Sequence, residues 1–446
     1  MTEKQFTTLP VGRLFAKLAI PNIFSMVFSS IYMMADGIFV GRFIGAHALA
    51  AVNLVMPIMM IVFALSDMIA VGSSVKVSTT LGEGDIPKAR GLFSASVLMI
   101  VGLGFAFSLL GMLFAKPLIF ATIKDAILAE QAYRYVQVFI YGLPFIMPLF
   151  AMDNFLRVCG KAKYSMWVNI IVSILNIGLD WLFIGVWDLG IEYSAVASVI
   201  SMFLGAICCF MPFFTKKITL HFAKPAITRK EAAGIIYNGS SEFFSSVAGS
   251  FIATVLNGFL LALGGALAVA SYGVVMYIDT LLVGVLYGIT DSIQPAISYN
   301  LGAGEHRRTF AFFKIAGITT SFLSLLCMGS ILLFPTELAG FFTKPGDAAM
   351  LHMTVAALVL FAPSYLFTWF NMVTSAFLTA MDKPRQSIII MIFRALVFPV
   401  ICLFGLSALI GVYGVFATAA VSGGLTAVVA FIVFRRSAKL LWRFPR

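Results

Sequence analysis

Residues 18–52 read LAIPNIFSMVFSSIYMMADGIFVGRFIGAHALAAV, an apolar run of membrane-spanning length that carries one proline and one aspartate. Pro21 removes a backbone hydrogen bond and allows a helix to bend. Asp36 places an ionisable group among apolar residues, which is costly in a membrane and by default marks a functional position. The two residues lie about 22 Å apart along a helix that rises 1.5 Å per residue. The stretch therefore predicts a bendable helix that carries a titratable carboxyl group.

The whole chain has the composition of a membrane protein. Of its 446 residues, 61% are hydrophobic and 11% are charged, and the mean hydropathy is +1.01. Apolar stretches of about 20 residues recur along its length, which indicates a polytopic helical membrane protein. We predict twelve spans, near residues 14–41, 48–76, 91–114, 132–155, 165–187, 193–214, 235–260, 268–298, 310–334, 354–379, 387–410 and 412–434.

The net charge of +11 reflects topology, since the basic residues gather on one side of the predicted spans. Of the 30 Lys and Arg residues, 24 fall on that side, five fall on the other, and Arg394 lies inside a span. By the positive-inside rule, both termini are expected in the cytoplasm. The basic side is expected to contact the lipid bilayer, and no nucleic acid partner is indicated.

Two polar motifs recur in the second half of the chain. LGEGD at 81–85 returns as LGAGE at 301–305, and GKAK at 160–163 corresponds to DKPR at 382–385. The offsets along the chain are nearly equal for the two pairs, and each pair falls on the same predicted side of the membrane. Because an even number of spans separates the copies, the repeat is parallel, about an axis along the membrane normal.

The repeat predicts an all-α integral membrane protein with twelve transmembrane helices in two pseudo-symmetric six-helix bundles. The longest polar stretch, TKKITLHFAKPAITRKE at 215–231, lies between the sixth and seventh spans. We therefore predict an N-terminal lobe at 1–215, a cytoplasmic linker at 216–231 and a C-terminal lobe at 232–446.

Four polar residues of the predicted first, fifth and sixth helices lie at similar depth. Asp36, Asp180 and Ser198 are each about 9–11 Å inside the outer interface, and Asn176 is one helical turn deeper than Asp180 on the same face. Two neighbouring carboxylates in a medium of low dielectric constant resist carrying two charges, so this set could hold a proton or bind a cation. Sodium would also suit Asp36, Asn176 and Asp180. The simpler alternative is that Asp36 is an interfacial charge near a helix end.

A second charged set, Glu242, Asp279 and Arg394, lies 9–13 residues into three spans of the second half. Because unpaired charges there cost at least ~2.5–3.5 kcal/mol each, we expect them to pair with one another. They form either a structural ion pair or a site where one acid faces a cationic substrate or coupling ion. The intramembrane acids Asp67 and Asp291 receive no role.

Asp153, Asn154 and Arg157 lie near the cytoplasmic end of the predicted fourth helix, where water could reach them. The sequence contains no P-loop, HExxH, GxSxG or CxxC motif, and its four histidines form no cluster. The five cysteines have neither disulfide nor metal-site spacing. We therefore expect a protein that is not an enzyme and needs no cofactor other than an ion gradient.

The segments YMMADGIFVGRFIGAHALAAV, LGEGDIPKAR, LNIGLDWLFI and SIQPAISYNLGAGE together resemble the multidrug and toxic compound extrusion (MATE) family. The resemblance extends over nearly the full chain and is greatest to the bacterial MepA-like and DinF-like members. It implies a two-lobe fold in a bacterial plasma membrane that alternates between inward-open and outward-open states. It also implies the export of cationic, amphipathic small molecules, driven by a proton or sodium gradient, and a monomer is sufficient for this activity.

The resemblance also implies roles for individual residues of the N-terminal lobe. In similar proteins an aspartate of helix 1 and an Asn-x-x-x-Asp of helix 5 form the coupling site, a hydroxyl is typical in helix 6, and an asparagine occurs in helix 4. The helix 1 proline is where proton-linked bending has been proposed. The matching positions here are Asp36, Asn176, Asp180, Ser198, Asn154 and Pro21.

In the second lobe, Glu242 matches a helix 7 glutamate of some relatives, and Arg394 looks like an arginine of MepA-like members. Helix 10 has Asn371 where those relatives have an acid, which argues against a sodium site in this lobe and favours protons at the first. The alternative function is a lipid-linked oligosaccharide flippase of the same superfamily. That function predicts a strongly cationic cavity, whereas Arg394 is the only basic residue deep in a predicted span.

Overall fold

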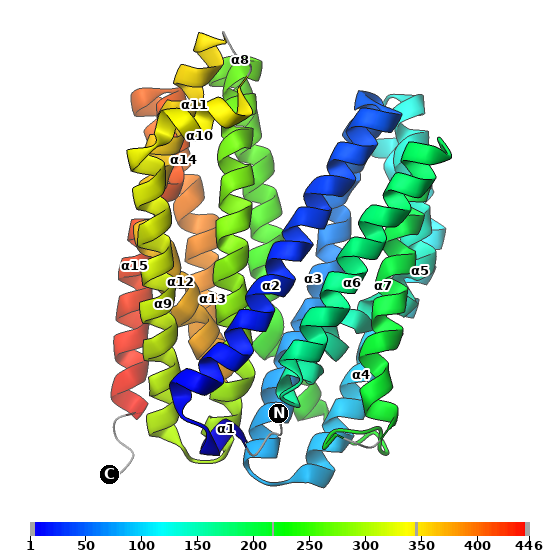
Figure 1. Ribbon diagram of the computed structural model, residues 1–446, viewed down its shortest axis with the longest axis vertical. Coiled ribbons are helices and arrows are strands. Elements are labelled where there is room, and N and C mark those ends of the chain that lie inside the picture. The colour runs from blue at the N-terminus through cyan, green and yellow to red at the C-terminus, as the bar shows by residue number, and fades with distance from the viewer. Residues whose placement is uncertain (1–4, 216–217, 344–346, 442–446) are drawn as a thin grey trace. The chain divides into compact units, whose positions relative to one another are not determined.

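The computed structural model describes residues 5–215, 218–343 and 347–441, and most of these residues lie in helices (Figure 1). In those ranges eleven helical segments are long and apolar enough to cross a membrane. One of them, α8 (Arg229–Gly302), is 74 residues long and is broken at Gly265, where φ is 63° and ψ is −162°. This helix therefore holds two spans, and the twelve predicted spans are all present.

The chain divides into two compact units, and Met1–Phe243 with Pro295–Thr309 forms unit 1. Besides both ends of α8, its elements are α1 (Gln5–Thr8), α2 (Val11–Phe39), the π-helical η1 (Val40–Ile44), α3 (Ala46–Gly82), α4 (Ile86–Thr122), α5 (Ala126–Val158), α6 (Ala162–Asp180), the π-helical η2 (Trp181–Val186) and α7 (Glu192–Phe214). Within this unit α5 packs against α3, α4 and α7, and α2 packs against α6.

Unit 2 consists of Phe244–Gln294 and Phe310–Arg446. It contains the middle of α8 together with α9 (His306–Leu333), α10 (Pro335–Phe342), α11 (Ala348–Phe361), the 3₁₀ turn η3 (Ala362–Ser364), α12 (Tyr365–Ala380), α13 (Pro384–Ile392), the π-helical η4 (Phe393–Val397), α14 (Phe398–Ile410) and α15 (Val412–Leu441). Within this unit α15 packs against α11, α12 and α14.

The compact units differ from the predicted lobes at two places, because residues 232–243 and 295–309 pack with unit 1. Glycines of α3 let the backbone of α8 come very close. A Cβ atom at Gly72 would lie 2.0 Å from the Ile235 carbonyl oxygen, and one at Gly82 would lie 2.1 Å from that of Tyr299. The predicted lobe boundaries remain a prediction.

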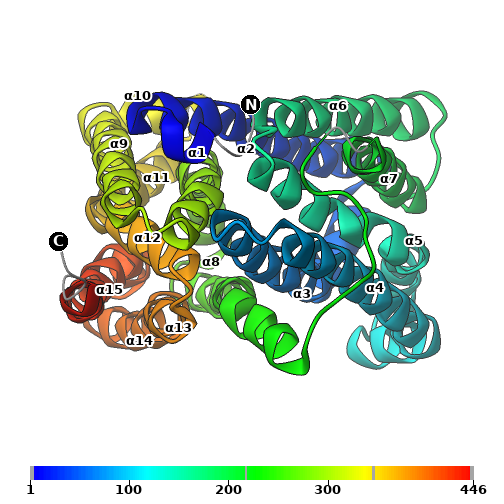
Figure 2. The same ribbon diagram turned by 90° about the horizontal axis from the view of Figure 1, so that it is seen from below.

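The predicted linker packs on unit 1 over the residues that the structure describes, 218–231; residues 216 and 217 lie outside the described ranges. Figure 2 shows the segment before α8 crossing the ends of the unit 1 helices. Arg90 Nε donates a hydrogen bond to the Thr219 carbonyl at 2.8 Å, and the Ala223 amide donates to Ser94 Oγ at 3.0 Å. Leu220 is fully buried. The segment is therefore anchored on unit 1, with Leu220 in the core of that unit.

The two halves share an aromatic contact between equivalent helices. In unit 1, Phe93 of α4 meets Phe155 of α5 with ring centroids 4.9 Å apart. In unit 2, Phe313 of α9 meets Phe377 of α12 at 4.7 Å. The first rings of the two contacts have the same offset along the chain as LGEGD and LGAGE, and the second rings have that of GKAK and DKPR. The repeat therefore preserves side-chain packing as well as chain order.

A glycine on α4 lets α5 approach closely, and its substitution tests this packing. A Cβ atom at Gly104 would lie 2.8 Å from Pro144 Cα and 3.0 Å from the Leu143 carbonyl oxygen. We expect Gly104→Ala to destabilise the protein by about 1–3 kcal/mol, because backbone atoms cannot move aside as a side chain can. Thermal unfolding in detergent micelles should show a lower midpoint.

The matched control is Gly102→Ala on the same helix, because a Cβ atom there would meet nothing within 4 Å. This variant should unfold at the wild-type temperature or above it, since alanine favours helix. Equal midpoints for the two variants would show that the α4–α5 contact does not limit stability.

Candidate functional site

Unit 1 brings four of the predicted site residues together. Asp36 comes from α2, Asn176 and Asp180 come from α6, and Ser198 comes from α7. These three helices lie side by side, since α6 packs against both α2 and α7 (Figure 1). All four residues are buried, with Asp180 fully enclosed and Asp36 8% exposed. Counting residues inward from the expected outer interface along each helix therefore identified side chains that lie close together in the structure.

The centre of the site is a contact between two carboxyl groups. The side chains of Asp36 and Asp180 lie close enough to share a hydrogen bond if one of them carries a proton. Ser194 Oγ on α7 donates a second hydrogen bond to Asp36 Oδ1 at 2.6 Å. Because an ionised carboxylate can only accept, a hydrogen bond between two carboxyl groups requires a proton on one of them. The geometry is therefore one in which the two carboxyl groups can share a proton.

Asn176 links this pair to α7. In the orientation that satisfies both of its neighbours, its amide nitrogen donates to Asp180 Oδ2 at 3.3 Å and its oxygen accepts from Ser198 Oγ at 3.0 Å. The other oxygen, Asp180 Oδ1, is buried, and no N–H or hydroxyl group among the described residues donates to it. A proton shared with Asp36 would offset the cost of this buried acceptor.

Polar neighbours and helix geometry also distinguish this site. The hydroxyl groups of Tyr32 and Tyr135 lie within electrostatic range of Asp36, and Tyr135 is also close to Asp180. The π-helical turns η1 and η2 follow shortly after Asp36 and directly after Asp180. Single π-helical turns inside α-helices are frequent at functional sites.

Sequence reasoning did not identify Ser194 or the two tyrosines, although a signal existed for two of the three. Ser194 precedes Ser198 by four residues on α7, and Tyr32 precedes Asp36 by four on α2, so each lies on the same helical face as a predicted site residue. Tyr135 comes from α5, and only the tertiary packing brings it to the site.

Two further predicted residues lie elsewhere in unit 1. Asn154 on α5 donates to the Phe150 carbonyl of its own helix at 3.0 Å, and no described contact joins it to the acid pair. Pro21 is buried inside α2, and its carbonyl accepts a hydrogen bond from Ser25 Oγ at 3.2 Å. Both roles remain predictions.

A buried ion pair lies beside Pro21, and the sequence had suggested that its two residues are accessible to solvent. Arg157 and Asp153, four residues apart on α5, pair through Nη2 and Oδ2, and their side chains are only 6% and 13% exposed. Arg157 Nη1 also donates to Asn22 Oδ1 at 3.3 Å, which ties α5 to the residue after Pro21.

The second carboxylate oxygen of Asp153 is also fully used, because it accepts from Ser165 Oγ and, at 3.0 Å, from Asn169 Nδ2 on α6. The expectation of simple solvation is therefore wrong for Asp153 and Arg157. Their spacing was visible in the sequence, but their burial depends on how α2, α5 and α6 meet.

The second predicted charge group is divided between the units. Glu242 belongs to unit 1, whereas Asp279 and Arg394 belong to unit 2 and line one cavity there. Asp279 Oδ1 accepts a hydrogen bond from the Tyr365 hydroxyl at 2.9 Å. The expected direct pairing is wrong for Asp279 and Arg394, which form no ion pair within 4.0 Å, whereas the placement of Glu242 with them remains a prediction.

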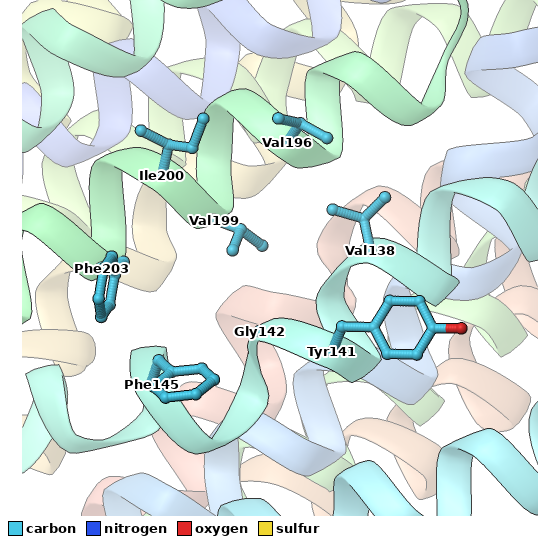
Figure 3. A pocket seen from close by; sticks show the side chains of 8 residues that line it. All are labelled: Val138, Tyr141, Gly142, Phe145, Val196, Val199, Ile200 and Phe203. Carbon is cyan, nitrogen blue, oxygen red and sulfur yellow. The ribbon is translucent and has the colours of Figure 1, made fainter.

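A pocket of about 500 Å³ lies between α5 and α7, but it has almost no polar side chains (Figure 3). Its lining is apolar, and Tyr141 supplies its only side-chain oxygen. Tyr141 and Phe145 are each about half exposed, as residues on a lipid-facing helix surface are. Pockets for small molecules usually contain a few convergent polar groups, and this groove offers a single tyrosine hydroxyl.

Comparison with known families agrees with the repeat. The MatE family model matches the chain twice, at residues 21–182 and 243–404. The two matches are equal in length and together cover more than half of the chain. Each contains one member of every repeated pair described above.

Similar proteins cover nearly the whole chain. The multidrug export protein MepA of Staphylococcus aureus (strain NCTC 8325 / PS 47) is 26% identical over 436 residues, which are 96% of this chain and 94% of MepA. A crystal structure of MATE in complex with MaL6 matches with a TM-score of 0.94 at 23% identity, over 98% of this chain and 99% of that one. An outward-facing multidrug resistance MATE family transporter of the MOP superfamily matches with a TM-score of 0.92 at 24% identity, over 98% of each chain. The fold is thus the twelve-helix fold of these transporters.

The two i, i+4 ion pairs of α5 allow a test of the buried network. Arg157→Gln would leave the Asp153 charge buried and unpaired, so we expect a loss of about 3–5 kcal/mol in unfolding free energy. Arg134→Gln removes the partner of Glu130 from a pair that is 55% and 43% exposed, and should cost about 1 kcal/mol or less.

Thermal unfolding of both variants in detergent micelles measures the difference. Asp153→Asn combined with Arg157→Gln should recover part of the lost stability, because no lone charge remains. A double variant no more stable than Arg157→Gln alone, or equal effects of Arg157→Gln and Arg134→Gln, would contradict a buried and mutually dependent pair.

Proposed function

The chain belongs to the MatE family of multidrug efflux transporters, and we propose that it is a cation-coupled antiporter that exports cationic, amphipathic drugs or toxic compounds by alternating access. It is a multi-pass membrane protein. We place it in a bacterial plasma membrane with both termini in the cytoplasm. The proposal includes the two remaining roles that the resemblance implies: no catalytic chemistry, and no energy source other than a transmembrane ion gradient.

The hydrogen-bonded pair Asp36–Asp180 carries the proposal. Its neighbours are apolar helices of unit 1, where an ionised group is expensive. The pair therefore has two accessible states: one that shares a proton, and one whose negative charge is offset by a bound cation. A cationic substrate and a coupling ion that compete for the same carboxylates cannot both be bound, and this exclusion is the requirement for exchange transport.

A proton fits this pair better than sodium does. A proton shared between the two carboxyl groups fits their contact as it stands, whereas sodium would have to separate them and draw on the oxygens of Asp36, Asn176 and Asp180. We therefore propose that protons drive export, entering as the substrate leaves. Because protonation removes a charge, it also weakens the attraction of the site for a cationic substrate.

Pro21 gives α2 a means to respond to this change. The proline lies inside the helix that carries Asp36, and it deprives that helix of one backbone hydrogen bond. We propose that α2 rearranges at Pro21 when the charge of the acid pair changes. Arg157, which holds Asn22 next to the proline, would fix the cytoplasmic part of α2 while the part that carries Asp36 moves.

The flippase alternative is not favoured. It calls for several free basic groups on a cavity wall. In unit 1 the buried guanidinium of Arg157 is already neutralised by Asp153, and the site itself is acidic.

Ethidium transport in reconstituted vesicles tests the proposal. With the outer buffer more acidic and sodium absent, wild-type vesicles loaded with ethidium should release it. Asp36→Asn and Asp180→Asn should each reduce release to the level of protein-free vesicles, because each removes one of the two carboxyl groups that share the proton and receive the cation in this proposal. Glu130→Gln, which changes an exposed acid of α5, should behave as wild type.

Two results would overturn the assignment. One is full transport by both aspartate variants. The other is release that requires a sodium gradient and ignores the pH gradient, which would retain the antiporter but replace the proton.

A further inference from the structure

Unit 2 contains a cavity of its own, about 260 Å³ in volume. It lies among α8, the α11–η3–α12 segment, η4, α14 and α15, and every residue that lines it belongs to unit 2. Its size falls just below the ~300–1,000 Å³ typical of pockets for drug-sized ligands. An occupant would therefore be a smaller molecule.

The cavity wall carries one acid and one base that do not pair directly. Asp279 accepts a hydrogen bond from the Tyr365 hydroxyl and lies within electrostatic range of Arg394. The guanidinium group contacts only the sulfur of Met391, at 3.9 Å, and has no carboxylate within 4.0 Å in the described part of the chain. Two opposite charges that face one cavity without touching leave room for a molecule between them.

A third polar group faces the same space. Asn371 of α12 is 1% exposed and lines the cavity. Its amide nitrogen donates to the Gly423 carbonyl of α15 at 3.1 Å, but its Oδ1 atom is buried without a partner. Native proteins seldom leave such an acceptor unsatisfied, so it points to a donor that a ligand supplies.

The helix geometry positions the base. Arg394 lies in the π-helical turn η4, which shifts the register of α13 and α14 around it. The rings of Tyr272 and Phe361 form an apolar part of the wall and pack edge to face at a centroid distance of 6.3 Å. The cavity thus offers separate places for a cation, an anion and an apolar group.

From these groups we propose that the cavity binds a small zwitterion with an apolar side chain, of the amino-acid class. Its carboxylate meets the guanidinium of Arg394 in a two-pronged hydrogen bond. Its ammonium group donates to Asp279 and to Asn371 Oδ1, and its side chain packs on Tyr272 and Phe361. A ligand with one charge would leave the opposite wall charge unpaired in a medium of low dielectric constant, so both charges are needed.

Three probes with the same phenylethyl group test this proposal: L-phenylalanine carries both charges, phenethylamine only the ammonium, and 3-phenylpropionate only the carboxylate. Binding is measured by equilibrium dialysis of the full-length protein in detergent micelles, with protein-free micelles subtracted. Wild-type protein should bind phenylalanine at least about tenfold more tightly than either of the other probes, the ratio that corresponds to roughly 1.4 kcal/mol.

Variants of Arg394 and Asp279 show which charged group of the ligand each residue binds. Arg394→Gln should abolish the advantage of phenylalanine over phenethylamine, and Asp279→Asn should abolish its advantage over phenylpropionate. Arg394→Lys keeps the charge but loses the fork of donors, so it should fall between wild type and Arg394→Gln. Arg385→Gln, at an exposed arginine of α13, should bind as wild type does.

Saturable binding with this pattern supports the site. The absence of saturable phenylalanine binding to wild-type protein with a cooperative thermal transition would overturn it, as would equal affinity for phenylalanine and phenethylamine. The measurement uses no ion gradient and depends only on residues of unit 2. Its failure would therefore leave the proposed exchange at Asp36 and Asp180 untouched, and loss of that exchange would not affect this binding.

Discussion

The protein depends on the contact between two carboxyl groups inside a bundle of apolar helices. Asp36 and Asp180 are both buried and lie close together, an arrangement that a shared proton would stabilise. Ser194 and Asn176 supply the remaining hydrogen bonds to the pair. No N–H or hydroxyl group donates to Asp180 Oδ1 in the described part of the chain. The exchange proposed above uses this contact between the two acids as its ion site.

The two halves share the packing contacts that support this site, whereas its acidic residues have no acidic counterpart in the other half. The contact Phe93–Phe155 has its counterpart in Phe313–Phe377, and the hydrogen bond of Ser165 to Asp153 has its counterpart in that between Ser387 and Ser375. In the second family match, however, the positions that correspond to Asp36 and Asp180 are Gly258 and Cys402, and neither is acidic. In the first family match, the positions that correspond to Asp279 and Arg394 are Pro57 and Val172. Each half therefore has a polar centre that the other half lacks.

The sequence predicted the elements and the depth of the site because helices are regular. Hydropathy located twelve spans, and a fixed rise per residue placed Asp36, Asp180 and Ser198 at one level. It could not predict which helix faces meet. For that reason the sequence did not identify Tyr135, and it suggested that Arg157 is solvated. It also suggested a linker separate from both lobes, although Leu220 in that linker is fully buried. Close approaches such as that at Gly72 appear in the sequence only as one more glycine.

Infrared difference spectroscopy on addition of ethidium tests the central claim most directly, because a protonated carboxyl group has its own carbonyl stretching band. Binding of the cation to wild-type protein should remove such a band as the shared proton leaves. The Asp36→Asn and Asp180→Asn variants should each lack this change. A wild-type spectrum without any ethidium-dependent loss, or the same loss in both variants, would contradict an acid pair that trades its proton for the cargo.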